Sequence, residues 1–163
     1  MRSGIDLYVE SSFWKRLSDS TSDPRRRISY RFLNLVRSKC RLRVSSLVWN
    51  EIEDSPNPDE RRFLTRRLEN AGARSMPVTR RVLEFAETLR GAGHWGDRQF
   101  ADMVHVACAM LHSCDALVTW NLRDLARGKL RQVAGIVALQ RNLVAPFVGT
   151  PLEVAPWIGL KIG

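Results

Sequence analysis

Cysteine is scarce in this sequence of 163 residues, and its three copies form no C-x-x-C pair. An odd number of widely spaced cysteines argues against a disulfide framework, and the missing C-x-x-C pairs argue against a zinc knuckle. Cys108 and Cys114 flank the end of an expected helix. We interpret both as small buried hydrophobic residues.

Long apolar runs and biased composition are missing as well. No uninterrupted apolar segment approaches the roughly 20 residues that a membrane-spanning helix needs. The first apolar stretch is short and contains Asp6 and Glu10, unlike a signal peptide. No repeat or low-complexity segment interrupts the chain. We therefore expect a cytoplasmic protein without a membrane partner, folded as one domain over residues 1–163.

Acidic residues are outnumbered by basic ones. Lys and Arg total 26 against 17 Asp and Glu, which gives a formal net charge of +9. A basic surface attracts polyanions through general electrostatics. The basic residues are concentrated in residues 25–43 and 61–67. Each run alone is typical of a solvated helix face, but together they favour a nucleic-acid partner.

Short apolar segments alternate with amphipathic ones along the whole chain. We expect strands at 5–9, 42–44, 74–78, 116–120 and 146–149. We expect helices at 11–18, 24–38, 46–52, 59–70, 80–91, 98–112 and 130–142. This alternation predicts an α/β fold with a mostly parallel sheet and helices packed on both sides.

Polar side chains follow several of these strands, at the edge where open parallel sheets bind ligands. Glu10 follows the first strand, Glu51 lies in the helix after the second, and Asn121 and Asp124 follow the strand ALVTW. Asp102 interrupts an apolar helix, where a lone carboxylate is costly unless it is paired or binds something. Clustered carboxylates repel one another, so proteins gather them mainly to bind a cation.

Oxygen ligands alone favour Mg²⁺ or Mn²⁺, and two such ions can support phosphodiester hydrolysis. A basic protein with an acidic metal pocket is therefore typical of a nuclease. Taken singly, each acid is more often a helix cap or a surface charge. His105 lies one helical turn beyond Asp102, and because no second D-x-x-H pair is present, we interpret it as structural or as orienting a ligand.

Nearly the whole chain carries, in this order, the segments LYVESSFW, VSSLVWNEIED, FADMVHVACAMLHSCDALVTWNLRDL and TPLEV. Together they resemble the PIN-domain ribonucleases, and most closely the VapC-like toxins of bacterial toxin–antitoxin pairs. The resemblance implies a PIN-like three-layer α/β sandwich with a mostly parallel central sheet. It also implies a Mg²⁺- or Mn²⁺-dependent endoribonuclease with RNA as substrate, a cognate antitoxin as partner, and a homodimer.

By position, the resemblance places the first three acids of the family on Glu10, Glu51 and Asp102. The fourth polar position falls on Asn121 or Asp124. The expected metal ligands are therefore Glu10, Glu51, Asp102 and Asp124, with Asn121 as a further catalytic candidate. The family's first acid is usually Asp, and Glu10 is longer by one methylene, which leaves the exact position of the ion open.

Substrate binding is expected from Ser12 and Arg98, which lie near these acids, and from the arginine run Arg25, Arg26 and Arg27. Ser12 has two alternative roles, since it can orient Glu10 or cap the following helix. Asp6 is interpreted as a bystander. The rival hypothesis is a catalytically silent PIN-like protein that binds RNA or acts as a scaffold, which Glu10 and the neutral Asn121 favour.

Overall fold

The computed structural model describes residues 4–125 and 128–163. Its strands form one sheet in the order β3-β2-β1-β4-β5, and every neighbouring pair is parallel. The strands are β1 (Ile5–Val9), β2 (Cys40–Ser45), β3 (Arg74–Met76), β4 (Ala116–Val118) and β5 (Phe147–Gly149). The α/β fold class expected from the sequence is confirmed.

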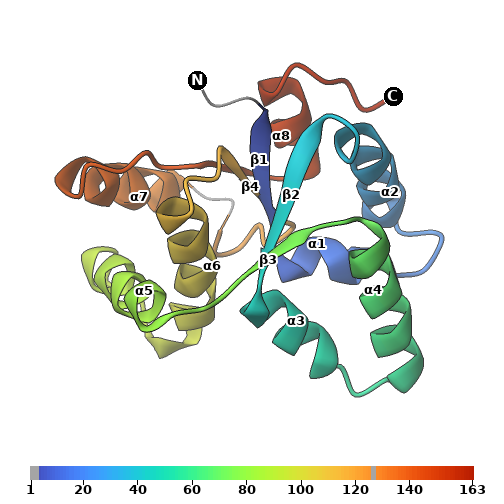
Figure 1. The fold of residues 1–163 in the computed structure, drawn as a ribbon, viewed down its shortest axis with the longest axis horizontal. Helices are drawn as coiled ribbons and strands as arrows, with labels where there is room; N and C mark the ends of the chain where they lie inside the picture. The colour runs from blue at the N-terminus through green and yellow to red at the C-terminus, as the bar shows by residue number, and fades with distance from the viewer. Residues whose placement is uncertain (1–3, 126–127) are drawn as a thin grey trace.

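The helices lie on both sides of this sheet. They are α1 (Ser11–Arg16), α2 (Pro24–Val36), α3 (Ser46–Glu53), α4 (Pro58–Asn70), α5 (Arg80–Ala92), α6 (Phe100–Leu111), α7 (Gly128–Gln140) and α8 (Pro151–Trp157). In Figure 1, α5, α6 and α7 lie on one side of the strands, and α1, α2 and α4 lie on the other. None of the helices in the described ranges is long and apolar enough to cross a membrane.

The central strand β1 decides where the polar residues meet. It pairs with β2 through Leu7 and Leu42 and with β4 through Val9 and Val118. Both β1 and β4 are almost wholly buried, as expected for strands of a parallel sheet that is covered on both faces. Because parallel strands end at one edge of the sheet, the residues that follow β1, β2 and β4 lie near one another.

The starts of the helices follow from local capping. Asp23 accepts a hydrogen bond from the backbone of Arg25 and is followed by Pro24, which opens α2. Asn57 caps α4 in the same way. Helix α8 was not among the expected elements, although Thr150 and Glu153 form a capping box at its start. The T-P-L-E pattern therefore carried a helix signal that the apolar periodicity did not, because α8 has only 7 residues.

Candidate metal centre

Glu10 lies between β1 and α1, and it is both a helix cap and a member of a polar cluster. Its Oε2 accepts hydrogen bonds from the backbone N–H of Ser12 at 3.1 Å and from the hydroxyls of Ser12 and Thr119, the latter at 2.9 Å. The side chain caps α1 while only 4% of the residue is exposed. Its other oxygen, Oε1, lies 3.8 Å from Nε2 of His105. One oxygen of this carboxylate thus caps the helix, while the other faces the polar cluster.

His105 lies between the two glutamates of the cluster. Its Nε2 is 2.9 Å from Oε1 of Glu51, and its Nδ1 is 2.7 Å from the hydroxyl of Tyr8. That hydroxyl is also 2.8 Å from Oγ of Ser45, so a buried chain of polar groups runs from β2 to the cluster. Potential ligand atoms of Glu10, Glu51 and His105 all lie within 4.8 Å of one another.

The charges of this cluster are set by opposing effects. Burial lowers the pKa of His105, but the hydrogen bond with Glu51 and the charge of Glu10 outweigh it, and the pKa is raised. Burial raises the pKa of Glu51, but the hydrogen bond and charge of His105, together with smaller effects that include the charge of Lys15, outweigh it, and the pKa is lowered. Burial also raises the pKa of Tyr8 well above its usual value, so its hydroxyl keeps its proton. Glu51 is therefore held as a carboxylate.

Asp102 lies in the first turn of α6 and faces the same cluster. Its Oδ1 accepts a hydrogen bond from Nδ2 of Asn121 at 3.3 Å, and Oδ1 of Asn121 accepts one from the backbone of Asp124 at 3.0 Å. Burial raises the pKa of Asp102 to about 6, and the negative charges of Glu10, Asp124 and Glu51 contribute to the increase against the opposing effect of His105. The structure therefore brings all four predicted acids into one electrostatic neighbourhood.

This neighbourhood has the chemistry of a cation site. Within residues 4–125 and 128–163, no lysine or arginine forms an ion pair with Glu10, Glu51, Asp102 or Asp124. The imidazole of His105 faces several carboxylates, and their charges favour its protonated form. The charge of Lys15 also acts on Glu51. Clustered carboxylate oxygens suit a divalent ion, whose charge would relieve their mutual repulsion. The residues present thus fit such a metal.

The residues predicted to contact substrate lie in different surroundings. The hydroxyl of Ser12 is engaged inside the cluster, because it donates to Glu10 and accepts from the backbone of Trp120 at 2.8 Å. Arg98 is exposed on the short 3-10 turn Asp97–Gln99 that precedes α6. The assignment of both residues to substrate binding stays a prediction.

The three consecutive arginines at the start of α2 differ from one another. Arg25 pairs with Asp23 at 2.8 Å, and Arg26 lies over the ring of Tyr30, with its Cζ 4.9 Å from the ring centre. Arg27 is exposed. The run that looks uniform in the sequence therefore presents one neutralised, one stacked and one solvated cation.

Two residues of the cluster were not predicted from the sequence. Tyr8 precedes Glu10 by two positions, so the strand alternation brings its side chain toward the same face, but an apolar strand offers no reason to expect a polar role for it. Thr119 is a hydroxyl at the end of the apolar strand ALVTW, and it contacts Glu10 directly. Because Thr119 is only two residues from Asn121, its position in the sequence could have indicated a place in the cluster.

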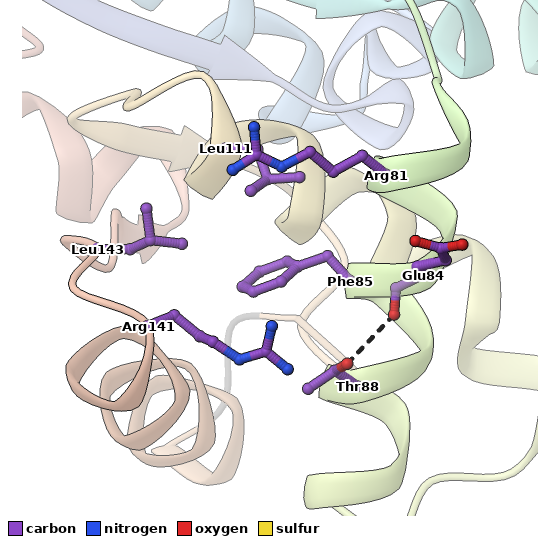
Figure 2. A pocket seen from close by; sticks show the side chains of 7 residues that line it. All are labelled: Arg81, Glu84, Phe85, Thr88, Leu111, Arg141 and Leu143. Carbon is purple, nitrogen blue, oxygen red and sulfur yellow. Dashed lines mark hydrogen bonds between the residues drawn. The ribbon is translucent and has the colours of Figure 1, made fainter.

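A separate cavity of about 460 Å³ lies between α5 and the segment after α7. Its lining residues are Arg81, Glu84, Phe85, Thr88, Leu111, Arg141 and Leu143. Figure 2 shows Arg81 and Arg141 extending from different elements toward the space around Phe85. Leu111 ends α6 whereas Asp102 lies in its first turn, so roughly 14 Å of helix separates this cavity from the acids. The cavity is thus no part of the acidic cluster.

No protein-family model and no curated protein matches this sequence. Solved structures do match it, at low sequence identity. VapBC2 from Rickettsia felis, bound to a DNA fragment from its promoter, is 11% identical, with 90% of this chain and 98% of that chain covered and a TM-score of 0.61. A toxin–antitoxin complex from Klebsiella pneumoniae is 18% identical, with 89% and 97% covered and a TM-score of 0.59.

A third match is VapC20 from Mycobacterium tuberculosis, described as a toxin that cleaves the sarcin–ricin loop. It is 17% identical, with 77% of this chain and 93% of that chain covered and a TM-score of 0.58. At such identities the likeness concerns the fold. The chain has the PIN-like fold of VapC-type toxins, and the resemblance inferred from its sequence segments is confirmed at that level.

Proposed function

We propose that this protein is a metal-dependent endoribonuclease that acts as the toxin of a toxin–antitoxin pair. The observation that carries the proposal is the cluster of acids without a lysine or arginine partner, at the carboxyl edge of the sheet in a chain of net charge +9. Similar solved structures include a toxin described as cleaving the sarcin–ricin loop and complexes of toxins with antitoxins. They support RNA as the substrate and an antitoxin protein as a partner.

Glu10, Glu51, Asp102 and Asp124 would hold Mg²⁺ or Mn²⁺. Such an ion supplies the activation of water and the stabilisation of the leaving oxygen that phosphodiester hydrolysis needs. The other polar residues hold the ligands in place: Thr119 and Ser12 fix Glu10, and Asn121 joins Asp102 to the backbone of Asp124. Asn121 is therefore an orienting residue in this proposal, and Asp124 supplies the fourth charge.

His105 is a positioning residue in the same proposal. Its hydrogen bond orients Glu51, while Tyr8 fixes the other side of the imidazole ring. The homodimer implied by the family resemblance and the blocking of the acidic cluster by an antitoxin also belong to this proposal. An antitoxin that supplies a cation to these carboxylates would satisfy them as a metal does.

A catalytically silent RNA-binding protein is the second candidate. The specific observation in its favour is that Nε2 of His105 already gives Glu51 a hydrogen bond and approaches Glu10. A glutamate pair satisfied by a histidine needs no ion to be stable. The neutral side chain of Asn121 lowers the number of charges in the cluster in the same direction.

Metal binding and RNA cleavage, measured on the same samples, distinguish the two candidates. The variant is Glu51→Gln, and its matched control is Glu53→Gln, which changes an exposed glutamate of the same helix. We expect Mn²⁺ at about 100 times its Kd to stabilise the parent by about 2.7 kcal/mol, and a chelator to abolish RNA cleavage. Glu51→Gln should lose both effects and Glu53→Gln should keep both. RNA binding without a metal-induced shift and without cleavage would establish the silent protein instead.

A further inference from the structure

Two arginines from different helices share one tyrosine ring on the surface between α2 and α4. The Cζ atom of Arg26 lies 4.9 Å from the centre of the Tyr30 ring, and that of Arg67 lies 5.4 Å from it. Arg67 also lies over Phe63, at 5.1 Å. We call these four residues the arginine stack. Arg26 and Tyr30 belong to α2, and Phe63 and Arg67 belong to α4.

The stack holds its cations in fixed positions. The Tyr30 hydroxyl donates to the backbone carbonyl of Leu17 at 3.2 Å, which attaches the ring to the end of α1. A guanidinium group stacked on a ring keeps the N–H groups at its edge free, and these match the oxygen geometry of a phosphate. A pre-oriented guanidinium also loses less conformational freedom when it binds an anion.

The carboxylates near the stack are already engaged. Asp19 pairs with Arg16 at 2.7 Å, and Asp59 pairs with Arg62. Glu60 accepts hydrogen bonds from the hydroxyls of Ser18 and Ser55. In contrast, Arg26, Arg66 and Arg67 form no ion pair with any carboxylate in the described part of the chain. Two unpaired cations that share one ring repel each other, and an anion bound near both would relieve that repulsion.

Hollows in the surface flank the stack. One of about 370 Å³ is lined by Arg26 and Phe63 among others, and one of about 450 Å³ is lined by Phe63, Arg66 and Arg67 among others. Helix α1 connects this surface to the acidic cluster, because it begins directly after Glu10 and its C-cap, Leu17, accepts the hydrogen bond from Tyr30. Its 6 residues span roughly 9 Å, so a nucleic-acid strand that passes the acids can reach the stack.

We infer that the arginine stack binds the phosphate backbone of the RNA, at a position outside the acidic cluster. The inference rests on the proposed function for the identity of the strand, but not on metal binding or on cleavage. Arg25 is no part of this surface, because Asp23 neutralises it. The RNA contact is therefore made by one arginine of the sequence run 25–27 together with a distant arginine of α4.

The test compares two double variants that remove the same charge from the same two helices. Arg26→Gln with Arg67→Gln removes the stacked cations, whereas Arg25→Gln with Arg62→Gln removes cations that are paired with Asp23 and Asp59. Binding of a short, mixed-sequence, single-stranded RNA with a fluorescent label is measured with a chelator present, at several salt concentrations. The chelator prevents cleavage, so the result is independent of the nuclease proposal.

We expect the first variant to bind RNA about tenfold more weakly, and the slope of log affinity against log salt to decrease by about 1.4 in magnitude, from about 0.7 for each lost phosphate contact. The second variant should bind as the parent does within about twofold. Equal losses in both variants would show a general charge effect and overturn the inference. A parent that binds RNA through the stack but never cleaves it would leave the inference standing while the proposed function fails.

Two further measurements keep the result interpretable. Arg67→Lys retains the charge but loses the planar fork, and we expect an affinity between those of the parent and the first variant. It also covers the case in which the double variant does not fold, which thermal unfolding detects.

Labelled polyglutamate serves as a probe for an acidic protein segment. If the first variant lost polyglutamate binding but kept RNA binding, the stack would be a protein-docking surface and the inference would be wrong.

Discussion

The two ends of β1 each bury a carboxylate, and they treat it in opposite ways. Asp6, at the amino end, is 2% exposed and is paired with Arg41 at 2.6 Å and with Arg43 at 2.8 Å. Glu10, just beyond the carboxyl end, is 4% exposed and is held by hydroxyl and backbone donors. Its nearest ionisable partner is His105, which it shares with Glu51.

The difference shows in the acidity of the carboxyl groups. Hydrogen bonds from Arg41 outweigh burial and, together with Arg43, lower the pKa of Asp6 to about 2. At the other edge, burial and the neighbouring carboxylates raise the pKa of Asp102 to about 6. A carboxylate buried for stability is given cations by the protein itself, whereas this cluster of carboxylates is left short of positive charge. That shortage of positive charge supports the proposed cation site.

Asp102→Asn tests most directly whether the acidic cluster binds a metal, because it removes one charge at nearly constant shape. We expect RNA cleavage to fall more than about 100-fold, because the cluster loses a metal ligand. We also expect the stabilisation by Mn²⁺ to be mostly lost. Cleavage assays and melting curves with and without Mn²⁺ measure both effects. A fully active Asp102→Asn protein would remove Asp102 from the site.

The stability of the metal-free protein gives a second measure of the same substitution. A carboxyl group whose folded pKa is raised from 3.8 to about 6 stabilises the fold below pH 3.8, and this contribution is lost as the pH rises to about 6. Asp102→Asn should therefore be as stable as the parent at pH 7, or more stable, and should lack this part of the pH dependence. Urea unfolding between pH 4 and pH 7 follows the difference. A variant that is much less stable at pH 7 would make Asp102 a structural residue.

Asp6→Asn is the matched change at the other end of β1, and its effect should be on stability alone. The lowered pKa of Asp6 corresponds to about 2 kcal/mol of stabilisation. This stabilisation is present above pH 3.8 and is lost as the pH falls through about 2. Asp6→Asn should cost about 1–2 kcal/mol at pH 7, since Arg41 and Arg43 regain contact with water. Urea unfolding at pH 7 and pH 3 should show the difference shrinking at the lower pH.

The Asp6 variant also tests the site assignment from outside. Its Mn²⁺-induced stabilisation and its cleavage rate should equal those of the parent, because Asp6 lies at the opposite end of the strand from the cluster. A loss of either would show that the two ends of β1 are coupled. Asp6 is therefore expected to take no part in catalysis, although it has a structural role, since its carboxylate joins β1 to Arg41 and Arg43 of β2.

The contrast between Asp6 and Glu10 also explains what the sequence could and could not predict. Alternating strands and helices predicted the α/β fold, and the polar residues that follow the parallel strands predicted a cluster at that edge of the sheet. The roles of Asp6 and Tyr8 were hidden, because both belong to a strand whose apolar pattern gives no sign of their partners. Those partners, Arg41, Arg43 and His105, lie at least 35 positions away in the sequence. The register of β1 against β2 brings the two arginines close to Asp6, and the position of α6 brings His105 close to Tyr8.

The uneven roles of the arginines were hidden for a related reason. A run such as residues 25–27 reads as one basic patch, but each side chain of a helix points in a different direction. Arg25 turns back to its own cap at Asp23, and Arg26 meets a ring that Arg67 also covers. Pairing of this kind depends on the packing of α2 against neighbouring elements, which composition does not encode.

Tyr8→Phe sharpens the comparison by leaving all the acids in place and removing one support behind them. His105 and Ser45 would each lose a buried hydrogen-bond partner. We expect a loss of about 1–2 kcal/mol in stability and about tenfold in Mn²⁺ affinity and cleavage. Mn²⁺ titration followed by melting temperature measures the affinity. Tyr30→Phe is the control, because it also removes a tyrosine hydroxyl, but one that donates to the carbonyl of Leu17 and not to a residue of the acidic cluster. It should leave the affinity for Mn²⁺ unchanged.

Thr119→Val should give the smallest effect, because Glu10 keeps two other donors. The substitution removes the hydroxyl that donates to Oε2 of Glu10 at 2.9 Å and accepts from the backbone of Asn121 at 2.9 Å, while the side chain keeps its shape. Ser12 still supplies its backbone N–H and its hydroxyl to the same oxygen. We expect a loss of about 1 kcal/mol in stability and a decrease of a few-fold in Mn²⁺ affinity.

Thr119→Ser restores the hydroxyl and should restore the Mn²⁺ affinity, which separates the lost hydrogen bond from any change in packing. If Thr119→Val bound Mn²⁺ as tightly as the parent and cleaved RNA at the same rate, the hydroxyl would serve only to cap the buried end of β1. Glu10 would then resemble Asp6, a carboxylate whose partners serve the fold. A reduced affinity that serine restores would instead show that the hydroxyl holds Glu10 in position for the ion.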